Sequence, residues 1–293
     1  MAALPSIAAL IVLGTTALLA SAPDTILVQE RVFGSFQRAT RLVTSPQGWI
    51  YVVDADRNTI VLFKDQDSSP SFVGGYGWTA TTFAQPTGIA TDGLNVYVSD
   101  LGNHRIQRFD RFLNYISSFS TRDTDVVSAR FGYPAGVALS RLGDLFILDT
   151  ENLRVVKYAG SGKFERSFGG IHDERGKLRR PLKILAGQND YIYILEPERL
   201  LQYDYFGNFI QSIGVGVLGS ARGFDVVGSR AVVLSQDTLY WFSERGEVTL
   251  AIPVRFIVTS APIGEVEDIA LVRDRLYLLT SQKVFTLEIH AVD

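Results

Sequence analysis

Cysteine is absent from this chain of 293 residues. The chain therefore cannot form a disulfide, a thiolate metal site, a cysteine nucleophile or a lipid-modified cysteine. Histidine is scarce, since His104, His172 and His290 are the only three, and this leaves few ligands for a histidine-rich metal site. A basic excess is also missing, because the formal net charge is −3, which disfavours general binding to nucleic acid. We expect no resident metal, no cofactor and no nucleic-acid partner.

A long uncharged run occurs at the N-terminus, and the rest of the chain offers no second candidate span. Residues 2–23 carry no charged side chain, and the run ends at the small residues Ala20, Ser21 and Ala22, as in a secretory signal peptide. An uncleaved anchor is the alternative, since about 20 apolar residues can span a bilayer. We expect residues 1–23 to be a signal peptide or an N-terminal anchor, with cleavage preferred. The remaining chain would then be exported to a periplasmic, cell-envelope or extracellular location, with membrane contact only through residues 2–23 if they stay uncleaved.

A repeated pattern fills the rest of the chain. Residues 36–63, 83–110 and 131–158 share an apolar segment, a turn, a strand that ends in Asp, a short loop and another strand, and weaker copies follow at 178–204, 221–243 and 266–288. The second strand of each unit ends at Asp54, Asp100, Asp149, Glu196, Ser235 and Thr280, which are 39 to 49 residues apart. Six units of this length, rich in alternating apolar and β-branched residues, predict an all-β, six-bladed β-propeller with four-stranded antiparallel blades.

The two chain ends are expected to complete the last blade together. The sixth unit runs out of chain after its third strand, and residues 27–34 resemble the outer strands of the earlier units. We expect residues 25–34 to form the outer strand of the last blade, which would leave no open sheet edge at the seam. A linker without regular structure is the alternative. The predicted domain therefore covers residues 24–293.

The best-defined unit has a recognisable motif. It reads Pro86-Thr-Gly-Ile-Ala, then Val96-Tyr-Val-Ser-Asp, then Gly102-Asn-His-Arg-Ile-Gln-Arg-Phe-Asp, and it resembles the NHL repeat. The resemblance is also good in residues 131–170, fair in 36–77 and degenerate in the last three units. It implies a six-bladed propeller but no single activity, because the family includes binding modules on ubiquitin ligases, RNA-binding repressors, extracellular sensor domains and an amidating lyase.

The repeated polar residues of this motif are interpreted as structural. Asp100 and Asp149 end a strand, where a carboxylate can accept backbone N–H groups of the following turn, and Asn103 and Asn152 can do the same. Arg105 and Arg154 could then pair with these carboxylates. His104 belongs to the same motif and is expected to be a turn residue.

Catalytic motifs are hard to find in the sequence. Asp54-x-Asp56-x-Asn58 opens like a calcium loop but lacks its Gly and distal Glu, and no Gly-x-Ser-x-Gly elbow occurs. The histidine ligands and cysteines of the amidating lyase and the Glu-Gly-Pro motif of gluconolactonase-like hydrolases are not matched either. We expect no catalytic residue and a non-catalytic protein-interaction or scaffold module; the alternative is a metal-dependent hydrolase or lyase with its site in the central channel.

A binding site is predicted at one mouth of the channel, where the inner strands begin. The alignment of the units places positive Arg41, Lys183 and Arg222 there, with negative Glu267 and Asp268 opposite. Gly88 and Gly136 are expected to leave one side of this mouth open. Exposed Tyr76 and Trp78 in a neighbouring loop could act as anchors. We expect a protein partner, or a small anionic ligand, on this face; salt bridges between neighbouring blades are the alternative interpretation of the charges.

Overall fold

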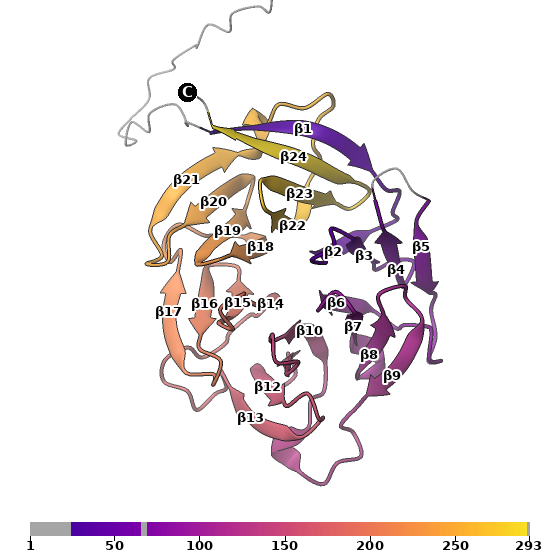
Figure 1. The fold of residues 1–293 in the computed structure, drawn as a ribbon. Helices are drawn as coiled ribbons and strands as arrows, with labels where there is room; N and C mark the ends of the chain where they lie inside the picture. The colour runs from indigo at the N-terminus through magenta and orange to yellow at the C-terminus, as the bar shows by residue number, and fades with distance from the viewer. Residues whose placement is uncertain (1–24, 66–68, 292–293) are drawn as a thin grey trace, which may run out of the picture.

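The structure is a computed structural model that describes residues 25–65 and 69–291. These residues form six four-stranded sheets around a central axis (Figure 1). The predicted signal peptide or anchor at residues 1–23 lies outside the described residues and stays a prediction. In the part of the chain that is described, no helix is both long and apolar enough to cross a membrane.

Blades 1 to 3 follow one another along the chain, each running from the axis outward. Blade 1 contains β2 (Ala39–Thr44), β3 (Ile50–Asp54), β4 (Thr59–Phe63) and β5 (Ser71–Gly74). Blade 2 contains β6 (Pro86–Thr91), β7 (Asn95–Asp100), β8 (Arg105–Asp110) and β9 (Tyr115–Phe119), with the short 3-10 helix η1 (Leu101–Asn103). Blade 3 contains η2 (Val127–Ala129), β10 (Pro134–Leu139), β11 (Leu145–Asp149), β12 (Arg154–Tyr158) and β13 (Phe164–Phe168).

Blades 4 to 6 complete the ring. Blade 4 contains β14 (Lys183–Ala186), β15 (Ile192–Glu196), β16 (Arg199–Tyr203) and β17 (Phe209–Ile213). Blade 5 contains β18 (Ala221–Val227), β19 (Arg230–Ser235), β20 (Thr238–Phe242) and β21 (Val248–Pro253), followed by η3 (Val254–Phe256). Blade 6 contains β22 (Val266–Val272), β23 (Arg275–Thr280), β24 (Val284–Ala291) and, as its outer strand, β1 (Thr25–Phe33).

The core is divided among the contacts between neighbouring blades. Every residue of β3 and β4 is buried, since both faces of these strands meet another sheet. Tyr51 and Val53 of blade 1, for example, pack with Phe83, Val98 and Phe109 of blade 2. Burial on both faces explains the near-continuous apolar runs of the middle strands. The prediction of a six-bladed propeller with four antiparallel strands per blade is confirmed.

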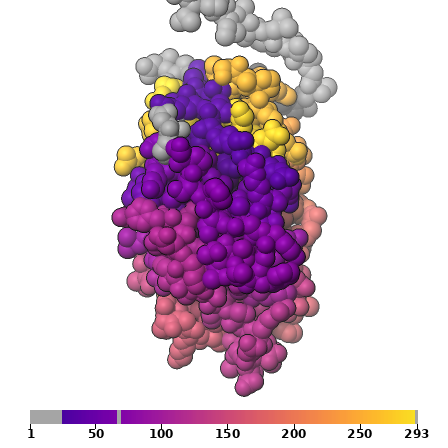
Figure 2. Space-filling view, turned by 90° about the vertical axis from the view of Figure 1, so that its right-hand side faces the viewer, coloured from indigo at the N-terminus to yellow at the C-terminus, as the bar shows by residue number. Residues whose placement is uncertain are grey.

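Ring closure by the N-terminal strand is confirmed as well. The strand β1 pairs antiparallel with β24, from Ile26 opposite His290 to Phe33 opposite Val284, with one bulge between Gln29 and Arg31. In Figure 2 the indigo N-terminal strand lies among the yellow and orange residues of the last blade. The closing blade is thus built from both ends of the described chain.

All six predicted strand ends fall where the structure has them, but the partner of the terminal carboxylate differs from the expectation. Asp100 Oδ1 accepts the backbone N–H of Ala84, 16 residues earlier, at 2.7 Å, and Asp149 Oδ1 likewise accepts that of Gly132 at 3.2 Å. These donors belong to the segment that leads into the inner strand of the same blade. The prediction that the N–H groups come from the following turn was therefore wrong, because the carboxylate points back across the sheet.

The other motif residues surround the same carboxylate. Asn103 donates its side-chain amide to Asp100 at 2.7 Å, rather than accepting N–H groups, and Arg105 Nε lies 2.8 Å from Asp100 Oδ2. The equivalent Arg154–Asp149 pair is 3.3 Å long. His104 has a left-handed backbone with φ of 53°, in keeping with its predicted place in a turn. The arginine–aspartate pairing is confirmed in both blades.

Candidate functional site

The propeller has two different faces. One face carries the segments that connect the outer strand of one blade to the inner strand of the next, together with the loops between second and third strands; we call it the interblade face. The opposite face carries the tight turns between first and second and between third and fourth strands; we call it the hairpin face. The predicted channel mouth lies on the interblade face, because the inner strands begin there.

Two of the predicted charged residues meet directly in the channel. Lys183, at the start of β14, places Nζ 2.6 Å from Asp268 Oδ1 of β22 and 3.0 Å from the carbonyl oxygen of Phe224 in β18. Asp268 is fully buried, and its other oxygen accepts the backbone N–H of Leu42 at 3.1 Å. One ion pair therefore ties blades 4, 5, 6 and 1 together across the channel.

Two more of the predicted charged residues, Arg41 and Arg222, are engaged within the molecule. Arg41 reaches across the axis from β2 and donates to the carbonyl oxygen of Leu182 at 2.9 Å. Arg222 forms an ion pair with Glu265 in the segment before β22. Glu267 is half-buried at the start of β22, beside Asp268. The Arg222–Glu265 pair joins neighbouring blades, as in the alternative interpretation of the charges, whereas Arg41 and Lys183 contact blades that are not next to their own.

The two glycines at this mouth close it rather than leave it open. A Cβ on Gly88 of β6 would lie 2.6 Å from the Cα of Gly136 in β10, so the two inner strands touch through their backbones. A Cβ on Gly223 would similarly meet the Cα of Asp268 at 2.8 Å. The expectation of an open side was wrong, since a residue without a side chain here allows close strand approach. A gap of about 20 Å³ is left between these strands.

The channel widens toward the hairpin face instead. A cavity of about 490 Å³ is lined by the later residues of all six inner strands, including Leu42, Ile89, Val137, Ile184 and Ile269. Asp225, in the middle of β18, is one of its few charged lining residues. Its carboxylate accepts the backbone N–H groups of Val226 and Leu271, each at 2.7 Å. Burial raises the pKa of Asp225 to about 6, although the positive charge of Lys183 acts to lower it.

The sequence interpretation passed over Asp225 as a site residue. The signal was available, because Asp225 stands between the apolar residues Phe224 and Val226 in an inner strand. A carboxylate in such a position is either paired or faces a polar cavity. The alignment could place it on an inner strand, but its neighbours come from blades 4 and 6, distant in sequence.

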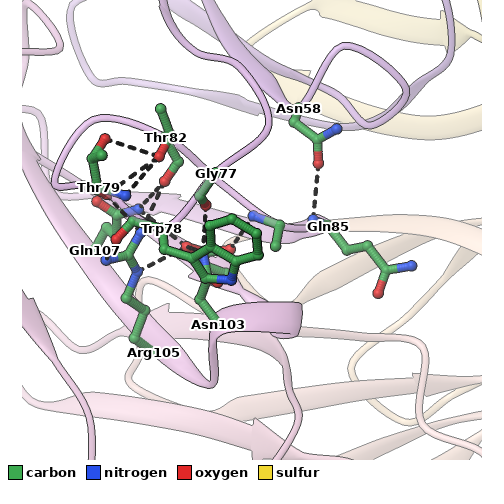
Figure 3. A network of polar contacts seen from close by, with 11 residues as sticks. Asn58, Gly77, Trp78, Thr79, Thr82, Gln85, Asn103, Arg105 and Gln107 are labelled. Carbon is green, nitrogen blue, oxygen red and sulfur yellow. Dashed lines mark hydrogen bonds and ion pairs between the residues drawn. The ribbon is translucent and has the colours of Figure 1, made fainter.

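Tyr76 and Trp78 project from the interblade segment between blades 1 and 2. Their side chains are 68% and 70% exposed and contact each other edge to face, with ring centroids 5.4 Å apart. The backbone beneath them is fixed: Asn103 donates to the carbonyl oxygen of Gly77 at 2.9 Å, and Arg105 donates to that of Trp78 at 3.2 Å (Figure 3). The same motif that stabilises blade 2 thus holds an exposed aromatic pair in place.

Further hydrogen bonds anchor both ends of this segment. Arg105 also donates to the carbonyl oxygens of Thr79 and Thr82, at 2.8 and 2.9 Å, and Gln107 donates to that of Thr82 at 2.8 Å. At the far end, the backbone N–H of Gln85 binds the side chain of Asn58 in blade 1 at 2.9 Å (Figure 3). The segment is therefore connected to two blades, and the aromatic pair stands on a rigid support.

Other exposed apolar side chains share the interblade face. They occur in the segments that follow β5, β9, β13, β17 and β21: Tyr76, Trp78, Val126, Val127, Tyr133, Ile171, Val215, Val217 and Phe256. Tyr133 contacts His104, with the two rings 4.6 Å apart. Scattered exposed apolar residues are ordinary, but a concentration on one face is typical of an interaction surface.

A metal-dependent activity would need several carboxylate or imidazole ligands around one point. Within residues 25–65 and 69–291, no group of three or more His, Cys, Asp or Glu side chains is close enough to hold a metal ion. In the channel, the Asp268 carboxylate is paired with the Lys183 ammonium.

Comparison with known proteins agrees with the motif and the fold. The NHL repeat model matches residues 83–109 and 131–158, which lie in blades 2 and 3. A curated relative, the protein brain tumor of Drosophila melanogaster, is 28% identical over 113 residues. This match covers 37% of the chain and 11% of the relative, so the chain spans about a tenth of that protein's length.

Solved structures of similar shape include enzymes. A catalytically inactive virginiamycin B lyase from Staphylococcus aureus, crystallised with quinupristin, is similar with a TM-score of 0.61 and 14% identity over 85% of this chain and 80% of that one. A luciferin-regenerating enzyme is similar with a TM-score of 0.63 and 11% identity over 90% of this chain and 95% of that one. At such identities these likenesses establish the propeller fold alone.

Proposed function

We propose that this NHL-repeat propeller is a protein-interaction module that binds its partner through the interblade face, with Tyr76 and Trp78 as the central anchor. The observation that carries this proposal is the exposed aromatic pair on a segment held by Arg105 and Asn103. Large aromatic side chains dominate the energy of many protein interfaces. A rigid support adds affinity, because less conformational freedom is lost on binding.

The charges of this face also favour a protein over a nucleic acid. Several of its cationic side chains form ion pairs within the molecule: Arg38 with Asp56, Arg180 with Glu198 and Arg222 with Glu265. A nucleic-acid surface instead needs unpaired Lys and Arg for the phosphates. The similarity to the protein brain tumor indicates no particular partner for this chain.

Affinity capture with matched variants tests the proposal. The double variant Tyr76→Ala/Trp78→Ala removes the aromatic pair, and Leu142→Ala removes a side chain that is 73% exposed on the hairpin face. A partner captured by the natural chain should be purified and its affinity measured with each variant. We expect a loss of about 30-fold or more for the double variant, as for interface anchors of about 2 kcal/mol, and little change for Leu142→Ala.

Two outcomes would overturn the proposal. One is equal affinity of the partner for the natural chain and for the double variant, with circular dichroism showing that the fold is intact. The other is salt-sensitive binding of RNA through this face in an electrophoretic assay, which would indicate a nucleic-acid surface instead.

A further inference from the structure

The cavity of the channel has one wide end and one closed end. On the interblade side it is closed by the Lys183–Asp268 ion pair, by Arg41 and by the contact between Gly88 and Gly136. On the other side it extends to the hairpin turns, where Ser45, Pro46, Gln188 and Arg273 are among the lining residues. The cavity therefore opens on the face opposite to the aromatic pair.

The wall of the cavity is mainly apolar, and its size suits a small molecule. Branched side chains from blades 1 to 6 line it, and the charged lining residues are Lys183, Asp225 and Arg273. Of these, Arg273 is exposed at the rim, while Lys183 and Asp225 lie deeper. The volume of the cavity, about 490 Å³, falls within the roughly 300–1,000 Å³ of typical ligand pockets.

Unused hydrogen-bonding capacity remains at the closed end. The Lys183 ammonium has three N–H groups, and two of them are directed to Phe224 and Asp268. The Asp225 carboxylate has about four acceptor positions, and two of them receive backbone N–H groups of Val226 and Leu271. A donor and an acceptor are thus both available on the wall of one apolar cavity.

The charges at this end balance one another. Arg41 and Lys183 are positive, and Asp225 and Asp268 are negative, so the four side chains sum to zero when all are ionised. An anion brought from water into this cavity would find the Lys183 ammonium already paired with Asp268. A cation would approach Asp225 close to that same ammonium, which binds the carbonyl oxygen of the adjacent Phe224. Either ion would lose its hydration without full compensation, whereas a hydroxyl or amide could bind both an acceptor and a donor.

We propose that this cavity binds a compact, uncharged apolar molecule that carries one hydroxyl or amide group, with the apolar body against the branched side chains and the polar group between Lys183 and Asp225. This binding site is independent of the interblade face, so a partner protein and the small molecule can be bound together.

A set of ligands with one apolar body and four head groups tests the site by isothermal calorimetry at pH 7.5. The probes are 1-adamantanol, adamantane-1-carboxamide, adamantane-1-carboxylate and 1-adamantylammonium. We expect one site per chain, with the alcohol and the amide binding at least tenfold more tightly than either ion. Tighter binding of an ion would overturn the assignment of an uncharged ligand, and absence of binding by all four would overturn the site.

Three variants test whether the probes bind inside this cavity. Val227→Trp places a large side chain at a half-buried cavity-lining position beside the opening and should abolish binding of the alcohol. Asp225→Asn keeps the shape but removes the charged acceptor, and should weaken the alcohol about tenfold. Leu142→Ala, on the hairpin face but outside the cavity lining, should leave the affinity unchanged. Unchanged affinity in the folded Val227→Trp protein would show that the probe binds elsewhere and overturn the proposal.

Discussion

A buried carboxylate at the end of the second strand is the most informative single residue of the repeat. Asp100 is fully buried and accepts hydrogen bonds from Ala84, Asn103, Arg105 and Gln107. It joins the start of its own blade to the loop that carries the aromatic pair. The side chain therefore acts as a structural centre, and its charge matters as much as its shape.

Substitution of this carboxylate should be costly. Asp100→Asn removes the charge that Arg105 pairs with, and it can place an amide donor against the donors that surround it. We expect the free energy of unfolding to fall by about 3 kcal/mol, as for other buried pairs that lose one partner. Urea denaturation followed by circular dichroism measures this change.

The matched control is Asp56→Asn in blade 1. Asp56 also pairs with an arginine, Arg38, at 2.6 Å, but both side chains are exposed. The expected loss is below about 1 kcal/mol, because exposed ion pairs contribute little. Equal losses for the two variants would contradict the central role of Asp100.

The pKa of Asp225 gives a prediction about pH. Burial raises it from 3.8 to about 6, so between these pH values the folded protein holds a proton that the unfolded chain has released. The free energy of unfolding should therefore fall as the pH rises through this range. Asp225→Asn should gain about 2 kcal/mol relative to the natural chain between pH 4.5 and pH 7.5, since one pKa unit corresponds to about 1.4 kcal/mol.

Carbon NMR of the labelled carboxylate measures this pKa directly, with the Asn variant identifying the resonance. Among charged groups, Lys183 lowers the pKa of Asp225 and Asp268 raises it. A measured pKa near 4 would show that the carboxylate is well hydrated and would contradict the prediction.

Residue roles were predictable where partners are close in sequence. Asp100 and Arg105 lie within one motif, so their pairing follows from their spacing, although the hydrogen bond from Asn103 to the same carboxylate was not predicted. Lys183 and Asp268 are 85 residues apart and meet only because blades 4 and 6 face the same axis. The sequence placed both residues at the channel mouth, but it could not show that they would neutralise each other there. Whether they contribute to binding stays a prediction.

At the scale of elements, the inner strands are packed through their glycines. Gly88→Ala would place a methyl group 2.6 Å from the backbone of the neighbouring inner strand, so β6 and β10 must separate. We expect a loss of about 1–3 kcal/mol in the free energy of unfolding, the usual range for overpacked sites. Thermal and urea denaturation measure it.

Gly264→Ala serves as the control for this change. Gly264 is exposed, and a Cβ there would meet no atom within 4 Å. We expect an effect within about 0.5 kcal/mol. If both variants unfold alike, the strands around the axis adapt more easily than their backbone contact indicates.

The strands themselves were largely predictable, even in the degenerate units. In blade 5, β19 and β20 keep their apolar runs although the motif residues are lost, and Ser235 still ends its strand. The open or closed state of the channel was not predictable, because it depends on how closely strands from different units approach. The same glycines that the alignment placed at the mouth turned out to close it.

At the scale of the whole molecule, the ring should unfold as a unit. Leu27 of β1 is 1% exposed in the core between blades 5 and 6, while its neighbour Ile26 is 39% exposed. We expect Leu27→Ala to cost about 2–4 kcal/mol and Ile26→Ala much less. Because every blade packs on two neighbours, amide exchange should accelerate by a similar factor in β10–β13, on the far side of the ring.

Hydrogen exchange measured by mass spectrometry distinguishes unfolding of the whole ring from local opening of blade 6. Acceleration confined to β22–β24 in the Leu27→Ala protein would show that blade 6 opens by itself, as a terminal repeat does in a linear array. Ile26→Ala reports on any effect of changing β1 that does not involve the core.

Because the interblade end is closed, the channel is a cavity with a single opening, on the hairpin face. The residual gap at the closed end, about 20 Å³, has room for roughly one water molecule. Anything that enters from the hairpin face must therefore drive solvent back out past itself in the opposite direction. A ligand associates and dissociates through the same opening. A narrower opening would therefore slow both rates but leave their ratio, and hence the equilibrium occupancy, unaltered.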